Sequence, residues 1–124
     1  MTCENKRVPS RNATPLTHPE TDAIDLTSLL SALGDPVRLG LVAALAAHDG
    51  DVACGTFDLP VGKSTASHHF RVLRDAGVLR QYDAGTRRFN QLRRADLEAR
   101  FPGLLSMVLA DGRRVDVAIL DTVS

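Results

Sequence analysis

The 124-residue chain lacks the features of a membrane or secreted protein. No apolar run approaches the ~20 residues needed to span a bilayer. Residues 1–19 are polar and contain no apolar signal core, so we expect no export. Two cysteines, Cys3 and Cys54, cannot form a disulfide framework, which fits a reducing cytosol. The sequence therefore predicts a cytoplasmic protein with no membrane partner.

The chain also has no net charge, because 15 basic residues balance 15 acidic ones. That balance argues at first against a nucleic-acid partner. However, residues 61–100 hold nine Lys and Arg against four acids, whereas residues 21–60 hold Arg38 against six aspartates. Because the local field governs attraction to phosphates, the basic half is still suited to nucleic acid.

The sequence shows no pattern of catalytic residues. It contains no Gly-rich phosphate loop and no loop typical of an oxyanion hole. Cys54 with His68 or His69 suggests a Cys/His nucleophile pair. Adjacent helical side chains point about 100° apart, so only one of these histidines could face the cysteine. We therefore expect no enzyme, no catalytic residue and no cofactor.

What the sequence does contain is a two-sided helical pattern that begins at Lys63. Apolar residues recur on one side, namely Ala66, Phe70 and Leu73, followed by Gly77. Polar donors lie on the opposite side, namely Ser64, Ser67, His68 and Arg71. This second face lacks the Glu/Lys pairs that usually cover a solvated helix. A helix that enters the DNA major groove needs such a donor-rich face.

The residues after this helix predict a basic hairpin. Gly77 can end the helix in the left-handed conformation. Residues 78–81 and 89–92 read as two short strands, and Gly85 fits the loop between them. Arg87 and Arg88 place paired guanidinium groups near the tip, where they suit phosphates. A mainly α-helical winged helix-turn-helix with a small β-hairpin is thus the expected fold.

The preceding residues predict two further helices. One runs from Thr21 to near Gly34, and Asp35 with Pro36 then provides an N-cap and a first-turn proline for another that ends near Ala47. Between that helix and Lys63, glycines and a proline disfavour a long helix, so we expect at most a single turn around residues 54–58.

The C-terminal part is predicted less completely. Asp96 is expected to cap a segment through Ala99, and Pro102 to start a last helix. In residues 111–124, Val115, Val117 and Ile119 alternate with polar residues, which fits either a short strand or an exposed extension. We divide the chain into a flexible arm (1–20), a DNA-binding and dimerisation domain (21–110) and a C-terminal extension (111–124).

Two motifs and the Gly85-containing hairpin resemble the ArsR family of bacterial winged-helix repressors over about residues 24–110. The motifs are Ala32-Leu33-Gly34-Asp35-Pro36-Val37-Arg38-Leu39 and Ser64-Thr65-Ala66-Ser67-His68-His69-Phe70-Arg71-Val72-Leu73-Arg74-Asp75-Ala76-Gly77-Val78-Leu79. The resemblance implies a homodimer that represses an operon until an inducer releases it from its double-stranded DNA operator. Its metal sites do not carry over, because Cys54 stands alone and no histidine follows His69.

The first and last helices are too apolar for so small a domain to bury alone, which predicts dimerisation through these N- and C-terminal helices. A two-fold dimer would place two recognition helices ~34 Å apart. The expected DNA-binding residues are Lys63, Ser64, Thr65, Ser67, His68, Arg71, Arg87 and Arg88.

Several alternatives remain open from the sequence. The polar face of the helix can be an ordinary solvated face, with Ser64 or Thr65 serving as its N-cap. One of Arg87 and Arg88 can pair with a nearby acid instead of a phosphate. His69 is interpreted as a partly buried, satisfied histidine. Cys54 is either an inert thiol or a redox switch, and intermolecular pairing of Cys3 would also make a thiol switch. The inducer is accordingly a small molecule or an oxidant. A winged-helix protein-interaction module without DNA binding is the remaining alternative.

Overall fold

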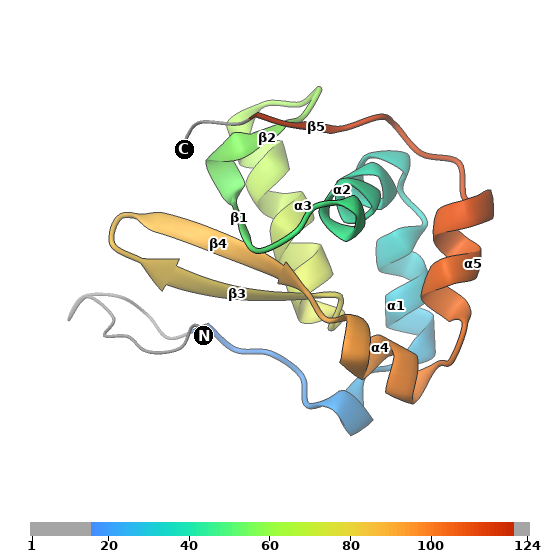
Figure 1. The fold of residues 1–124 in the computed structure, drawn as a ribbon. Helices are drawn as coiled ribbons and strands as arrows, with labels where there is room; N and C mark the ends of the chain where they lie inside the picture. Colours follow the sequence, from blue (N-terminus) through green and yellow to red (C-terminus); the bar gives the residue numbers. More distant parts are fainter. Residues whose placement is uncertain (1–15, 121–124) are drawn as a thin grey trace.

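The computed structural model describes residues 16–120 (Figure 1). The helices are the 3-10 turn η1 (Thr21–Ala23), α1 (Leu26–Leu33), α2 (Pro36–Ala47), the 3-10 turn η2 (Cys54–Thr56), α3 (Lys63–Asp75), α4 (Arg94–Arg100) and α5 (Leu104–Asp111). The strands are β1 (Val52–Ala53), β2 (Phe57–Asp58), β3 (Leu79–Ala84), β4 (Arg87–Leu92) and β5 (Ala118–Ile119). One antiparallel sheet has the order β1-β4-β3, and β2 pairs with β5 in another. The fold is a winged helix-turn-helix, as predicted. Cys3, most of the predicted arm and residues 121–124 lie outside the described residues.

Aspartates start the first two α-helices. The Asp35 carboxylate accepts hydrogen bonds from the Val37 and Arg38 amides (2.8 and 3.1 Å), and Pro36 occupies the first turn, as predicted. The predicted continuous helix from Thr21 is wrong, because the chain is extended at Asp25, which caps a separate α1. The local N-cap signal thus overrides the apolar periodicity that runs through it.

Glycine ends α3 as predicted. Gly77 has a φ of 89°, its amide donates to the Arg74 carbonyl (3.1 Å), and the Val78 amide donates to the Leu73 carbonyl (2.9 Å). A Cβ at Gly77 would lie 2.7 Å from the Ile24 side chain. Both the backbone conformation and the packing therefore require glycine where the chain leaves α3 for β3.

The hairpin strands are longer than predicted. Pairing continues from Leu79↔Leu92 to Ala84↔Arg87, so the loop contains only Gly85 and Thr86. Gly85 has a φ of 64°, as a two-residue hairpin loop requires at that position. The strand ends near the tip were not predicted, because their residues are polar and do not alternate with apolar ones. The hairpin projects away from the helices (Figure 1).

The segment between α2 and α3 contains the predicted single turn, η2, and two short strands that the prediction missed. Val52 of β1 pairs with Asn90, and Phe57 of β2 pairs with Ile119. Each strand is only two residues long, so neither carries a periodic signal. Residues 48–62 contain no α-helix, and the helix that usually precedes a recognition helix is reduced to η2.

Two predicted features of the C-terminal part are wrong. Asp96 lies inside α4, whose N-cap is Arg93, and its carboxylate instead accepts hydrogen bonds from Arg93 and Thr21. The last helix begins at Leu104 after a left-handed Gly103, rather than at Pro102. Of the two readings left open for the tail, the structure contains the short strand, β5.

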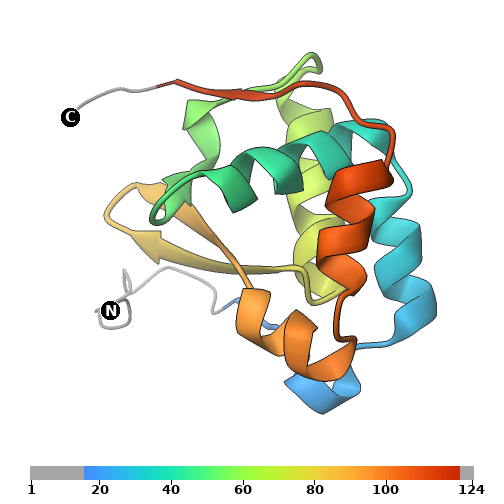
Figure 2. The same cartoon turned by 45° about the vertical axis from the view of Figure 1, so that its right-hand side comes forward.

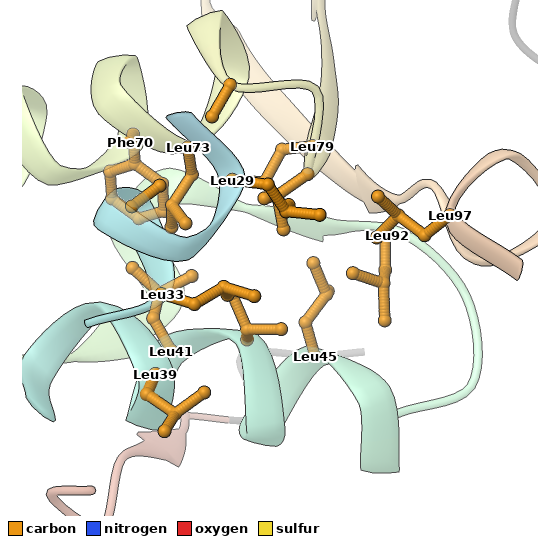
Figure 3. Packing of buried hydrophobic residues seen from close by; sticks show 14 of the residues in the cluster. Leu29, Leu33, Leu39, Leu41, Leu45, Phe70, Leu73, Leu79, Leu92 and Leu97 are labelled. Atoms are coloured by element: carbon orange, nitrogen blue, oxygen red, sulfur yellow. The ribbon is translucent and has the colours of Figure 1, made fainter. Parts of the chain in front are cut away.

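Leucines from α1, α2, α3, the sheet and α4 form the core (Figure 3). By contrast, α1 and α5 lie side by side (Figures 1 and 2) and expose the large apolar residues Leu26, Leu30 and Met107. No single helix among the described residues is long and apolar enough to cross a membrane. The consecutive helices α1 and α2 would together be long and apolar enough, but the chain bends by 95° between them.

Candidate nucleic-acid interface

The two faces of α3 separate in the structure as the periodicity predicts. Phe70 and Leu73 are buried, and the Phe70 ring packs against that of Phe57 with 5.5 Å between centroids. The polar face is exposed over its whole length, at Lys63, Ser64, Thr65, Ser67, His68 and Arg71. Gly62 is the N-cap residue and makes no side-chain capping bond, so the structure does not use Ser64 or Thr65 for that purpose.

Arg71 is a long, exposed side chain on this face. Its side chain is 72% exposed, and Nε lies 3.9 Å from the Asp75 carboxylate on the next turn. Exposed pairs of this geometry are worth only about 0.3–0.5 kcal/mol. The guanidinium can therefore exchange this partner for a base or a phosphate at little energetic cost.

His69 anchors α3 to the first two α-helices. Its Nδ1 lies 3.2 Å from Arg38 Nη1, and since arginine only donates, Nδ1 is the acceptor. The same guanidinium donates through Nε to the Ala32 carbonyl (2.7 Å). Burial lowers the pKa of His69, which keeps the ring neutral and able to accept. The interpretation of His69 as a satisfied, buried histidine is confirmed.

The two arginines near the hairpin tip lie on opposite faces, because neighbouring strand residues alternate. Arg88 pairs with Asp83 through two contacts of 2.8 and 3.2 Å. Arg87 is exposed, and its guanidinium carbon lies 5.3 Å above the centroid of the Phe89 ring. An aromatic ring holds a guanidinium in place without using its donors. Of the two, Arg87 therefore retains its full hydrogen-bonding capacity for a phosphate.

Several of the basic residues counted between 61 and 100 serve the fold itself. Arg93 is buried, donating through Nε to Asp96 (2.9 Å) and through Nη1 to the Pro19 carbonyl (2.8 Å). Arg74 Nη1 donates to Gln81 Oε1 (2.9 Å). The positive charge that is free to meet DNA is therefore smaller than the sequence count.

A polar layer on the buried face of the hairpin was missed by sequence reasoning. Asn90 is fully buried, where it donates to the Val52 carbonyl (3.0 Å) and accepts from Gln81 Nε2 (2.8 Å). Gln81, in turn, receives the Arg74 guanidinium and so ties β3 to α3. The available signal was that both amides fall on the strand face that carries Leu79 and Leu92.

Cys54 lies at the edge of this layer. Asn90 Nδ2 is 3.2 Å from its Sγ, and Gln81 Nε2 is 3.6 Å away. Burial raises the pKa of the thiol, whereas reactive cysteines have a lowered pKa. The arrangement therefore resembles a packed thiol more than a redox centre. Within residues 16–120, no three His, Cys, Asp or Glu side chains gather as metal ligands.

The fold defines a winged helix-turn-helix protein whose recognition helix presents a polar, exposed face. The chain is 27% identical over 92 residues to YceK of Bacillus subtilis (strain 168), an uncharacterised HTH-type transcriptional regulator. The match covers 73% of this chain and 92% of YceK. No protein-family model matches the chain. Fold and similarity together support a transcriptional regulator of the helix-turn-helix type.

Proposed function

We propose that the chain is a sequence-specific DNA-binding transcriptional regulator, a homodimeric repressor of the ArsR type that an inducer releases from its operator. The observation that carries this proposal is the exposed polar face of α3. The side chains of Ser64, Ser67 and His68 are exposed, all three can donate, and none hydrogen-bonds to another residue between 16 and 120. Their donors are therefore available to base edges in the major groove.

Each part of this surface has a chemical role in the proposal. The hydroxyls of Ser64, Thr65 and Ser67 and the His68 ring reach base edges, while Arg71 binds a guanine or a phosphate. Lys63, Arg87 and Arg88 contact the phosphate backbone, which fixes the register of the protein on the duplex.

Fluorescence anisotropy with the duplex upstream of the protein's own gene, at two salt concentrations, tests the proposal. We expect binding that is tighter than to unrelated duplex and that weakens steeply as salt rises. Absence of selective binding under reducing conditions would contradict the proposal and favour a protein-interaction module.

Dimerisation is proposed from the exposed apolar residues of α1 and α5. Leu26, Leu30 and Met107 expose 43%, 47% and 57% of their surface, although they belong to neighbouring helices. Such a patch is covered when a second copy packs on it. Sedimentation should show that Met107→Glu is monomeric, whereas Ser106→Glu, which adds the same charge at an exposed neighbour, remains dimeric. A monomeric wild-type protein would contradict this assignment.

The redox alternative is less well supported than a small-molecule inducer, because burial raises the pKa of Cys54. Repeating the anisotropy measurement with an oxidant separates the two. We expect operator binding to persist after oxidation. Its loss in the wild type, but not in Cys54→Ser, would restore the thiol switch.

A further inference from the structure

The chain after α5 returns across the molecule to the start of the recognition helix. Residues 112–120, here called the C-terminal strap, leave α5 and pass over α2 (Figures 1 and 2). At its start a Cβ on Gly112 would lie 2.4 Å from Leu39, so the strap is tight against α2 from its first residue. Further on, the Val115 amide donates to the Pro36 carbonyl (3.1 Å).

A glycine inside α2 marks the crossing point. A Cβ on Gly40 would lie 1.9 Å from the Val115 carbonyl oxygen and 3.1 Å from the Val117 side chain. Glycine is unfavourable inside a helix. Its presence at the buried position 40 is explained by the close passage of another backbone segment. Val117 and Ile119 then pack on the hydrophobic core. The strap is thus docked along its length rather than only at its end.

The strap ends as strand β5 on β2. Phe57 pairs with Ile119, and the Leu120 amide donates to the Thr56 carbonyl (2.7 Å). Only residues 59–62 separate β2 from α3, and the Phe57 ring contacts Phe70 of α3. The strap therefore holds the segment that leads directly into the recognition helix.

A helix-turn-helix normally has a full helix at this place to position the recognition helix. Here that helix is reduced to η2, and a two-residue strand has no stability without a partner. We propose that the C-terminal strap takes the place of the positioning helix, so that selective DNA binding depends on the β5–β2 pairing. This inference rests on the DNA-binding function proposed above.

The chain offers a matched pair of variants for the test. Leu120 exposes 51% of its surface, so its contribution to the strap is chiefly its amide. Leu120→Pro removes that donor. Proline has a fixed φ and favours an extended conformation for the preceding residue, Ile119, and both are compatible with a strand. Leu120→Ala removes the same side chain and keeps the amide. A difference between the two variants therefore reports the hydrogen bond to Thr56.

The first readout is amide hydrogen exchange in the first turn of α3, which needs no DNA. We expect the Ala66 amide, which donates to Gly62, to exchange faster in Leu120→Pro than in Leu120→Ala. The second readout is the ratio of affinities for a duplex enriched by the wild type from a random library and for poly(dI-dC). We expect this ratio to fall about tenfold in Leu120→Pro and to stay near the wild-type value in Leu120→Ala.

Equal exchange in the two variants would overturn the inference, and so would faster exchange with unchanged selectivity. If the wild type enriches no duplex, the proposed DNA-binding function fails, and the exchange comparison still decides whether the strap positions α3. Gly40→Ala provides a second variant, because it displaces the strap from the α2 side while favouring the helix itself. It should accelerate the same exchange, whereas Gly55→Ala, where a Cβ meets nothing within 4 Å, should not.

Discussion

Two regions of the molecule use the same kinds of polar side chain in opposite ways. On the outer face of α3, Ser67, His68 and Arg71 are exposed. On the inner face of the hairpin, Gln81 and Asn90 are buried and hydrogen-bonded to other parts of the chain. The comparison teaches that residue type alone does not identify a binding surface. A polar group that the fold has already satisfied has little left to offer a ligand.

Neighbouring residues show this contrast within single elements. His68 is exposed, whereas His69, one residue on, is buried and accepts from Arg38. On the hairpin, Arg88 is bound to Asp83, whereas Arg87 lies over the aromatic ring of Phe89. A rotation of about 100° on a helix, or of 180° on a strand, separates a structural residue from an available one.

The buried region should respond most strongly to substitution. Asn90→Ala removes the side-chain donor to the Val52 carbonyl and the oxygen that accepts from Gln81 Nε2, so we expect a loss of about 3 kcal/mol in the free energy of unfolding. Chemical denaturation measures this loss. Gln91→Ala, an exposed change at the next residue, should stay within ~0.5 kcal/mol. Similar losses in both variants would break the comparison.

The next effect is a pH dependence of stability. His18 Nε2 accepts from the Gln81 amide (2.9 Å), and burial, followed by the charges of nearby arginines, lowers its pKa to about 4. Because the unfolded ring binds a proton near pH 6.5, the stabilisation that depends on neutral His18 should fall as pH drops from about 7 to 4 and level off below. We expect about 2 kcal/mol from His18 after allowance for screening.

Thermal denaturation of His18→Gln across this range tests the assignment. The variant keeps an acceptor but does not titrate, so its stability should fall less between pH 7 and 4. Burial also lowers the pKa of His69, which leaves a residual slope of the same sign. Burial raises the pKa of Asp35 and Asp96, but hydrogen bonds lower both overall, so their contribution is lost below about pH 4. An unchanged slope would remove His18 from the explanation.

Substitutions on the outer face of α3 should change recognition without changing stability. His68→Ala and Arg71→Ala should each lose about 1–3 kcal/mol of discrimination between operator and unrelated duplex, while the melting temperature and the dimer persist. Competition anisotropy measures the discrimination. His48→Ala, which removes an exposed histidine beyond the end of α2, is the control. Intact selectivity in both α3 variants would refute the site assignment.

The smallest effects should come from the hairpin tip. Arg87→Ala should lower the slope of log affinity against log salt by about 1, because one phosphate contact is lost. Arg88→Ala should lower it less, since its guanidinium is engaged by Asp83. The double variant should weaken binding to any sequence. A larger effect at Arg88 would show that the pair with Asp83 opens on DNA.

Local signals explain which parts were predictable. The end of α3 at Gly77 and the start of α2 at Asp35 depend on residues within a few positions of each other. The two faces of α3 follow from the helical period alone. The burial of His69 was predictable, but its hydrogen bond with Arg38 was not, because the two residues lie on different helices.

By itself, the sequence determined the recognition helix, the hairpin and the start of α2, because caps, glycines and periodic apolar residues act over short distances. The tertiary structure alone decided which polar residues are available and how α3 is held. Asn90 meets Val52 across 38 positions and Gln81 meets His18 across 63. The two-residue strands β2 and β5 form only because each supplies the other's backbone partners. Such pairings leave no periodic pattern, since their hydrogen bonds exist only once distant segments have been brought together.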